Sequence, residues 1–284
     1  MTTVRTVREL REALAPARSS GRSIGLVPTM GALHEGHLSL LRAAREQCEV
    51  VVMSLFVNPA QFGPGEDLER YPRDEARDVA LAEAEGVDLV YAPSADEIYP
   101  PGFATTVEVS GLTDVLCGDP QRRGAEHFRG VTTVVAKLLN TVAPDRCYFG
   151  QKDAQQAIVI RRMVHDLDVD VEIVVRPTVR EGDGLAMSSR NAYLDAGVRK
   201  RAGALSRALD AADRAARSGG TPEDALAAAR SELEEAGIET EYLEARDAED
   251  LTTATSFNGR PVLVAVAARL GGTRLIDNAI IGGN

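Results

Sequence analysis

The chain has 284 residues, of which 44% are hydrophobic and 26% are charged, and its formal net charge at pH 7 is −11. These values are typical of a globular protein with one large and one smaller domain, and no apolar run approaches the roughly 20 residues that span a bilayer. The acidic balance disfavours nucleic acid as a partner, because phosphate backbones need a broad basic surface. The N-terminal segment lacks the apolar core and the small-residue cleavage site of a signal peptide, so we expect a cytoplasmic protein with no membrane attachment.

Up to about residue 178, predicted helices and strands alternate along the chain. Apolar residues at helical spacing predict the helices, and short continuous apolar runs that end near Gly or Pro predict strands buried on both faces. In chain order we predict a helix at 5–19, a strand at 23–30, a helix at 37–47, a strand at 49–59, a helix at 73–86, a strand at 87–93, a helix at 130–144, a strand at 145–150, a helix at 151–167 and a strand at 170–179. This alternation predicts a Rossmann-like α/β fold, a mostly parallel sheet with helices on both faces.

After residue 178 the alternation of predicted helices and strands ends. Two Ala-rich helices and then three strand-like segments are predicted, at 199–220, 221–237, 238–247, 261–270 and 273–281. We therefore predict two domains, a Rossmann-like domain at 1–178 and a smaller α+β domain at 179–284. The three cysteines are widely spaced and match no metal-binding pattern, so we interpret them as small buried hydrophobic residues.

Two histidines follow the first predicted buried strand, in the segment VPTMGALHEGHLSLLRAA. This segment passes from the strand through a Gly-rich turn to His34 and His37 at the start of a helix. At this edge of an open α/β sheet, the helix N-terminus offers backbone N–H groups to phosphate. Gly36 lets the backbone approach a ligand closely. His34 and His37 are three residues apart on one helical face, from which both imidazoles can donate to phosphate oxygens.

Two later segments supply further positive groups. FGQKDAQQ places Lys152 and Asp153 just after a predicted strand, at the same carboxyl edge of the sheet. A lysine there can neutralise charge that develops as pyrophosphate leaves. LAMSSRN, at 185–191, offers two hydroxyls and the guanidinium of Arg190 in a Gly-flanked loop, which is typical of a lid over a triphosphate. HEGH and this loop resemble the HxGH and KMSKS-type signatures of the nucleotidylyltransferase and class I aminoacyl-tRNA synthetase superfamily, although the leading Lys of KMSKS is absent.

A third element, FVNPAQF, carries Asn58 and Gln61 at the end of a buried strand. Their uncharged amides can hydrogen-bond a small hydroxy acid and leave its carboxylate nucleophilic. PTMGALHEGH, FVNPAQFGPGEDLERYPR, HFRGVTTVVAKLLN, FGQKDAQQ and PTVREGDGLAMSSRNAYL together resemble, in this order, the pantoate–β-alanine ligase (pantothenate synthetase) family. The resemblance runs from about residue 24 to 195, and the C-terminal strands with RLIDN extend it to the end of the chain.

The resemblance implies ATP-dependent condensation of D-pantoate with β-alanine to pantothenate, AMP and pyrophosphate through pantoyl adenylate. It also implies Mg²⁺ with ATP, no organic prosthetic group, and a homodimer. The catalytic residues that it implies are His34, His37, Lys152, Ser188, Ser189 and Arg190. The ATP-binding residues that it implies are Met30, Gly36, His37, Gly150, Lys152, Asp153, Val179, Met187, Ser188, Ser189 and Arg190. For pantoate it implies Gln61, Gln156, Met30 and Asn58, for β-alanine Gln61, Tyr71 and His127, and for magnesium Asp78.

Three other functions compete with this interpretation. An adenylyltransferase of the same superfamily acting on a phosphate acceptor needs Arg or Lys around that acceptor, where this chain has Gln61, Gln156 and Asn58. A tRNA-binding relative of the synthetases is disfavoured by the net charge of −11 and by the lack of a basic, aromatic-rich appendage. A non-catalytic structural role is disfavoured because each polar position that the chemistry needs is filled.

Overall fold

The computed structural model describes residues 1–282, and their contacts divide them into two units. The first unit comprises Met1–Gly150 and Val159–Pro177, and the second comprises Gln151–Ile158 and the chain from Thr178 onward. The second unit thus includes Gln151–Ile158, which the sequence places within the domain at 1–178. This segment joins the second unit because its first residues are hydrogen-bonded to the last strand of that unit. Within the described residues, no helix has both the length and the hydropathy needed to cross a membrane.

The first unit contains a parallel sheet of six strands in the order β1-β4-β3-β2-β5-β6. The strands are β1 (Thr2–Val4), β2 (Ile24–Thr29), β3 (Val50–Leu55), β4 (Leu89–Tyr91), β5 (Arg146–Gly150) and β6 (Glu172–Arg176). The order of the strands reverses between β2 and β5, and ligands bind beyond the carboxyl ends of strands at such a switch point. The chain segments that follow β2 and β5 contain His34 and Lys152, respectively.

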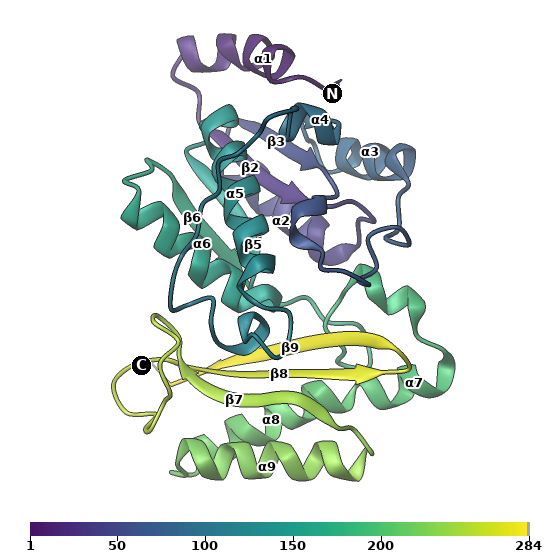
Figure 1. Cartoon of the computed structure of the whole chain (residues 1–284), viewed down its shortest axis with the longest axis vertical. Helices are drawn as coiled ribbons and strands as arrows, with labels where there is room; N and C mark the ends of the chain where they lie inside the picture. The colour runs from purple at the N-terminus through teal and green to yellow at the C-terminus, as the bar shows by residue number, and fades with distance from the viewer. Residues whose placement is uncertain (283–284) are drawn as a thin grey trace. The chain divides into compact units, whose positions relative to one another are not determined.

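Helices cover both faces of this sheet, as Figure 1 shows for α2 and α5. The helices are α1 (Val7–Ser19), α2 (Glu35–Gln47), α3 (Glu75–Ala84), α4 (Ala95–Ile98), α5 (Ala125–Val142) and α6 (Ala154–Asp166), of which α6 belongs to this unit only from Val159 onward. Successive strand residues point to opposite faces, so Leu26 of β2 packs in a cluster with Val135 of α5, and Val27 in another with Leu41 of α2. The predicted parallel sheet with helices on both faces is confirmed. The short elements β1 and α4 were not predicted, and α5 begins before residue 130.

The second unit packs helices against one face of an antiparallel sheet of three strands, β7-β8-β9 (Figure 1). Its elements are α7 (Ala196–Ala202), α8 (Ala204–Arg217), α9 (Pro222–Glu235), β7 (Thr240–Asp247), β8 (Val262–Leu270) and β9 (Thr273–Ile281). Buried alanines such as Ala208 of α8 and Ala225 of α9 belong to one core with the sheet. The helix predicted at 199–220 is divided at Gly203 into α7 and α8. All three cysteines are buried and unbridged, as predicted.

Candidate active site

Two histidines cap the N-terminus of α2 in the first unit. The helix begins at Glu35 with His34 as its N-cap, which is earlier than the predicted start at residue 37. Nδ1 of His34 accepts a hydrogen bond from the backbone N–H of Gly36 at 3.2 Å, and Nδ1 of His37 accepts one from the N–H of His34 at 3.4 Å. This is a capping box made of two imidazoles, whose ring centroids lie 4.1 Å apart. Because Nδ1 accepts in both rings, the neutral tautomer carries its proton on Nε2, so Nε2–H is the donating group of each imidazole.

The turn that leads into this cap is held by Asp78 of α3. One carboxylate oxygen of Asp78 accepts a hydrogen bond from the N–H of Ala32 and the other from the N–H of Leu33, both at 2.8 Å. The turn requires left-handed backbone at Gly31 (φ +85°), and Ala32 is also left-handed (φ 51°). A Cβ at position 31 would lie 2.9 Å from Oδ2 of Asp78. Glycine and carboxylate together therefore set the path of the chain up to His34.

These contacts decide whether Asp78 suits a magnesium ion. Its side chain is 1% exposed, and both oxygens are engaged with backbone N–H groups. Elsewhere in residues 1–282, no group of three or more His, Cys, Asp or Glu side chains could hold a metal ion. Asp78 therefore does not fit the role of magnesium ligand, and its contacts instead assign it to the turn before α2.

Replacing Asp78 with asparagine tests this role. The change is expected to lower the free energy of unfolding by about 1–3 kcal/mol, because the amide nitrogen cannot accept and leaves one buried N–H of Ala32 or Leu33 unpaired. Urea denaturation followed by circular dichroism measures it. The matched control is Asp96→Asn at an exposed position of α4, which is expected to change stability by less than about 0.5 kcal/mol. Equal stability of the two variants would contradict this assignment.

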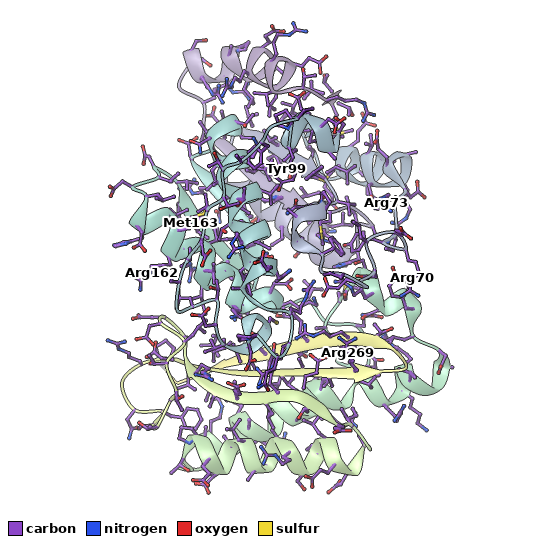
Figure 2. All side chains as sticks on the ribbon, viewed as in Figure 1. Arg70, Arg73, Tyr99, Arg162, Met163 and Arg269 are labelled. Atoms are coloured by element: carbon purple, nitrogen blue, oxygen red, sulfur yellow. The ribbon has the colours of Figure 1, made fainter. Side chains whose placement is uncertain are left out.

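A network of amides lies beyond β3 in the first unit. Nδ2 of Asn58 donates to Oε1 of Gln61 at 3.1 Å and to the carbonyl oxygen of Gly130 at 3.0 Å, which engages both amide hydrogens. The hydroxyl of Tyr99, labelled in Figure 2, donates to Oδ1 of Asn58 at 2.7 Å. Burial raises the pKa of Tyr99 to about 12, so this hydroxyl remains a donor at neutral pH. Nε2 of Gln61 donates to the sulfur of Met30 at 3.1 Å, so the orientation of the Gln61 amide is set from both ends.

The close approach of α5 to this network depends on Gly130. A Cβ at this position would lie 2.2 Å from the carbonyl oxygen of Ala60 and 2.7 Å from the backbone nitrogen of Gln61. We expect Gly130→Ala to cost about 1–3 kcal/mol of stability through overpacking against the backbone of Ala60 and Gln61. Thermal unfolding measures this loss of stability. Gly63→Ala, where the new Cβ meets only ordinary contacts beginning at 3.9 Å, is the control; unchanged behaviour of both variants would refute the steric argument.

His127 of α5 lies beside the backbone of Gln61. Its Nδ1 is 2.7 Å from the carbonyl oxygen of Gln61, and because a carbonyl only accepts, Nδ1–H is the donor. Its Nε2 lies 3.3 Å from Nη1 of Arg123. Nε and Nη2 of Arg123 donate to the two carboxylate oxygens of Glu66, at 2.7 and 2.6 Å. Burial acts to raise the pKa of Glu66, but the hydrogen bonds and the charge of Arg123 outweigh it and the pKa is lowered. A fixed guanidinium therefore stands next to His127.

Tyr71 lies in the loop that follows this network. Its ring packs edge-on against Phe62, with centroids 5.9 Å apart, and the residue is buried. Arg73, labelled in Figure 2, donates to the carbonyl oxygens of Leu68 at 2.8 Å and of Tyr71 at 3.3 Å. These contacts fold the loop back on itself.

Lys152 belongs to the second unit, in a single 3-10 turn, η3 (Gln151–Asp153). The turn directly follows Gly150, the last residue of β5. Nζ of Lys152 lies 3.8 Å from Oδ2 of Asp153, so the two side chains form an ion pair. α6 begins directly after the turn and carries Gln156 in its first turn.

A β-hairpin precedes the Ser-Ser-Arg segment in the second unit. The N–H of Met187 donates to the carbonyl oxygen of Val179 at 2.9 Å, and the N–H of Glu181 donates to that of Leu185 at 2.8 Å. Val179 and Met187 thus lie opposite each other at the open end of the hairpin. The chain leaves the hairpin directly at Ser188.

Most of the Ser-Ser-Arg segment lies in a 3-10 helix, η4 (Ser189–Tyr193), where the sequence predicts a loop. Ser188 is its N-cap, and its Oγ accepts a hydrogen bond from the N–H of Arg190 at 3.3 Å. Nδ2 of Asn191 donates to Oε1 of Glu181 in the preceding hairpin at 2.7 Å. The hydroxyls and the guanidinium are therefore carried by an ordered helical turn.

The predicted site residues are distributed over both units. The first unit holds Met30, His34, Gly36, His37, Asn58, Gln61, Tyr71, Asp78, His127 and Gly150. The second unit holds Lys152, Asp153, Gln156, Val179, Met187, Ser188, Ser189 and Arg190. Within the first unit, direct contacts join His34 to His37, and Asn58 through Gln61 to Met30 and His127.

Several residues that shape these sites were not predicted from the sequence: Tyr99, Arg123, Gly130, Arg180, Asp277 and Asn278. Gly130 lies in the segment HFRGVTTVVAKLLN, Arg180 in PTVREGDGLAMSSRNAYL, and Asp277 and Asn278 in RLIDN. For these four residues, their place in family-like segments was the available signal, whereas Tyr99 and Arg123 lie outside such segments. Which groups they bind depends on contacts between distant parts of the chain.

Comparisons with known proteins agree with these features. The chain matches the family described as pantoate-beta-alanine ligase over residues 2–280. It is 54% identical over 286 residues to the pantothenate synthetase of Moorella thermoacetica, with 99% of each chain covered. Its structure is similar to that of pantothenate synthetase from Thermus thermophilus, with a TM-score of 0.94, 49% identity and 100% of each chain covered. It is also similar to pantoate-beta-alanine ligase from Francisella tularensis, solved in complex with beta-gamma ATP and beta-alanine, with a TM-score of 0.79, 31% identity, and 99% of this chain and 97% of that chain covered.

Proposed function

Since the chain belongs to the pantoate-β-alanine ligase family, we propose that it condenses D-pantoate with β-alanine, using ATP, through a pantoyl adenylate intermediate. The products are pantothenate, AMP and pyrophosphate. The observation that carries this proposal is the pair of capping imidazoles at the N-terminus of α2, which follows β2 next to the switch point of the sheet. The structure of the Francisella tularensis relative in complex with beta-gamma ATP and beta-alanine supports the choice of substrates.

On the family resemblance we assign binding of the ATP phosphates to His34, His37, Lys152 and Arg190. In the first unit, the Nε2–H groups of His34 and His37 add to the partial positive charge of the α2 N-terminus, and Gly36 adds a backbone close to the ligand. In the second unit, Lys152 and Arg190 carry full positive charges, and the hydroxyls of the Ser-Ser pair can donate to phosphate oxygens. Met30, Gly150, Asp153, Val179 and Met187 stay assigned to ATP on the family resemblance.

We assign pantoate to the uncharged amides of Gln61 and Gln156. The geometry refines the part that Asn58 takes, because both of its amide hydrogens are used on Gln61 and Gly130. Asn58 therefore orients Gln61 for the substrate. We place β-alanine near His127 and Tyr71 on the family resemblance.

The chemistry that follows needs no nucleophilic side chain. The pantoate carboxylate attacks the α-phosphorus of ATP, forming an acyl–phosphate bond as the bond to pyrophosphate breaks. The neutral amine of β-alanine then attacks the acyl carbon, the acyl C–O bond to AMP breaks, and the nitrogen loses a proton to solvent. A carboxylate and a triphosphate repel each other, so positioning and electrostatic stabilisation by the imidazole, lysine and arginine groups account for catalysis. We infer that Mg²⁺ binds together with the phosphates of ATP, because both carboxylate oxygens of Asp78 are hydrogen-bonded to the turn before α2.

Pyrophosphate release in the absence of β-alanine tests this function. The protein is mixed with ATP, Mg²⁺ and D-pantoate, and we expect about one equivalent of pyrophosphate per site, the single-turnover stoichiometry expected when the acyl adenylate stays bound. AMP and pantothenate should then appear when β-alanine is added. Release that occurs with another small acceptor and fails with pantoate would favour an adenylyltransferase and refute the substrate assignment.

We also infer a cytoplasmic homodimer from membership of the family, since C2 dimers are the commonest soluble assemblies. Light scattering after gel filtration measures the mass directly. A monomer mass close to 30.3 kDa would contradict the inference.

A further inference from the structure

The side chain of Asn278, on β9, is bound to the turn that carries Lys152. Its Nδ2 donates to the carbonyl oxygens of Gln151 at 3.0 Å and of Lys152 at 2.9 Å. Its Oδ1 accepts from Nε2 of Gln151 at 2.9 Å. Asn278 is 5% exposed and belongs to the same unit as the turn. Both amide hydrogens are thus donated to η3.

From these contacts we propose that Asn278 is a positioning residue for Lys152. The proposal rests on the proposed function, in which Lys152 stabilises the charge on the phosphates. η3 has only three residues, and 3-10 hydrogen bonds have poorer geometry than those of an α-helix, so the turn gains little rigidity from its own backbone. A lysine side chain is flexible, so its ammonium is well placed only if its backbone is fixed. Displacement of a catalytic group by 1 Å can cost about 100-fold in rate.

The neighbouring residue extends the same anchoring to the hairpin before Ser188. Oδ1 of Asp277 accepts from the N–H of Asn278 at 2.8 Å, and both Asp277 oxygens pair with Arg180, at 2.6 and 3.1 Å. Nη1 of Arg180 also donates to the carbonyl oxygen of Gly184 at 3.1 Å. Asp277 is 2% exposed, so this ion pair is shielded from water on the carboxylate side. One buried stretch of β9 therefore holds the Lys152 turn and the hairpin that leads to the Ser-Ser-Arg segment.

The substitution Asn278→Asp tests the proposal because it keeps the size and the acceptor of the side chain and replaces the donor that faces the two carbonyls. We expect kcat for pantoate-dependent pyrophosphate release to fall about 10–100-fold, with KM for ATP and pantoate changed by less than about threefold, because a misplaced lysine acts on the transition state. Asn140→Asp, at an exposed position of α5, is the matched control and should keep the wild-type kcat. If Asn278→Asp does not fold, Asn278→Ser, which keeps one donor and adds no charge, is expected to show a smaller loss of kcat.

A double-mutant cycle separates positioning from general stability. When Lys152 is already alanine, adding Asn278→Asp is expected to reduce the remaining rate by less than about threefold, since residues that act as one unit are not additive. A further loss of about 10-fold or more would show that Asn278 acts independently of Lys152 and would overturn the inference. If Asn278→Asp kept the wild-type kcat while Lys152→Ala lost most of its activity, the positioning role of Asn278 would be overturned and the role of Lys152 would stand. Full activity of Lys152→Ala would overturn both this inference and the assigned role of Lys152.

Discussion

Replacing His37 with glutamine is expected to lower the rate of pantoate-dependent pyrophosphate release by about 10²–10³-fold, the usual effect of removing one donor from a developing negative charge. Glutamine at the third position of the helix can still accept from the N–H of His34 and complete a capping box, so the N-terminus of α2 should persist. The variant loses the rigid imidazole whose Nε2–H is directed by the acceptor role of Nδ1. Rapid-quench measurement of a single turnover reports the chemical step directly.

The control for this change is His165→Gln on α6, where the histidine side chain is 82% exposed. It should release pyrophosphate at the wild-type rate. Circular dichroism and thermal unfolding of both variants show whether the fold is intact. A His37→Gln protein that releases pyrophosphate at nearly the normal rate would remove His37 from the catalytic set.

For Lys152→Ala we expect a second loss of about 10²–10³-fold in the same reaction, because its ammonium carries a full positive charge on the chain segment that directly follows β5. The stability of the fold should change little, since the ion pair of the Lys152 ammonium with Asp153 spans 3.8 Å, and such pairs contribute at most about 1 kcal/mol. Single-turnover pyrophosphate release again gives the measurement.

Lys200→Ala, at an exposed position of α7, is the matched control and should behave as the wild type. Lys152→Arg is a more demanding variant, since a planar guanidinium does not replace a compact ammonium at a fitted site. If Lys152→Ala retains wild-type release of pyrophosphate, another group must neutralise the leaving pyrophosphate.

Much of the fold could be predicted from the short-range pattern of apolar residues along the chain. Continuous apolar runs such as 50–55 predicted strands buried on both faces, and residues of β2 do pack into separate clusters on opposite faces. Helical spacing predicted most of the long helices, because burial of one face repeats about every 3.6 residues whatever the rest of the chain does. β1 was not predicted because three residues are too few to show a periodic pattern of apolar side chains. It is a strand only because it pairs with β4.

The family was likewise determined by the sequence, through the order and spacing of HEGH and the later motifs, and the match over residues 2–280 confirms it. The chemical types of the proposed site residues could also be predicted from the sequence, because each imidazole, ammonium or amide group belongs to the residue itself. The assignment of Asp78 to magnesium shows the limit of such inference. The resemblance implied this role from a position in the sequence, and only the hydrogen bonds of Asp78 to the N–H groups of Ala32 and Leu33 show how its carboxylate is used.

Tertiary structure alone decided which polar side chains are bound to other groups of the protein. Asn58 donates both amide hydrogens to Gln61 and Gly130, and Asn278 holds the Lys152 carbonyl from 126 residues away in sequence. An amide has the same donors and acceptor wherever it occurs, and its local sequence does not specify the partner. Only the folded chain brings a distant carbonyl within hydrogen-bonding distance of it, and a buried amide must satisfy its hydrogen bonds with whatever the fold places there.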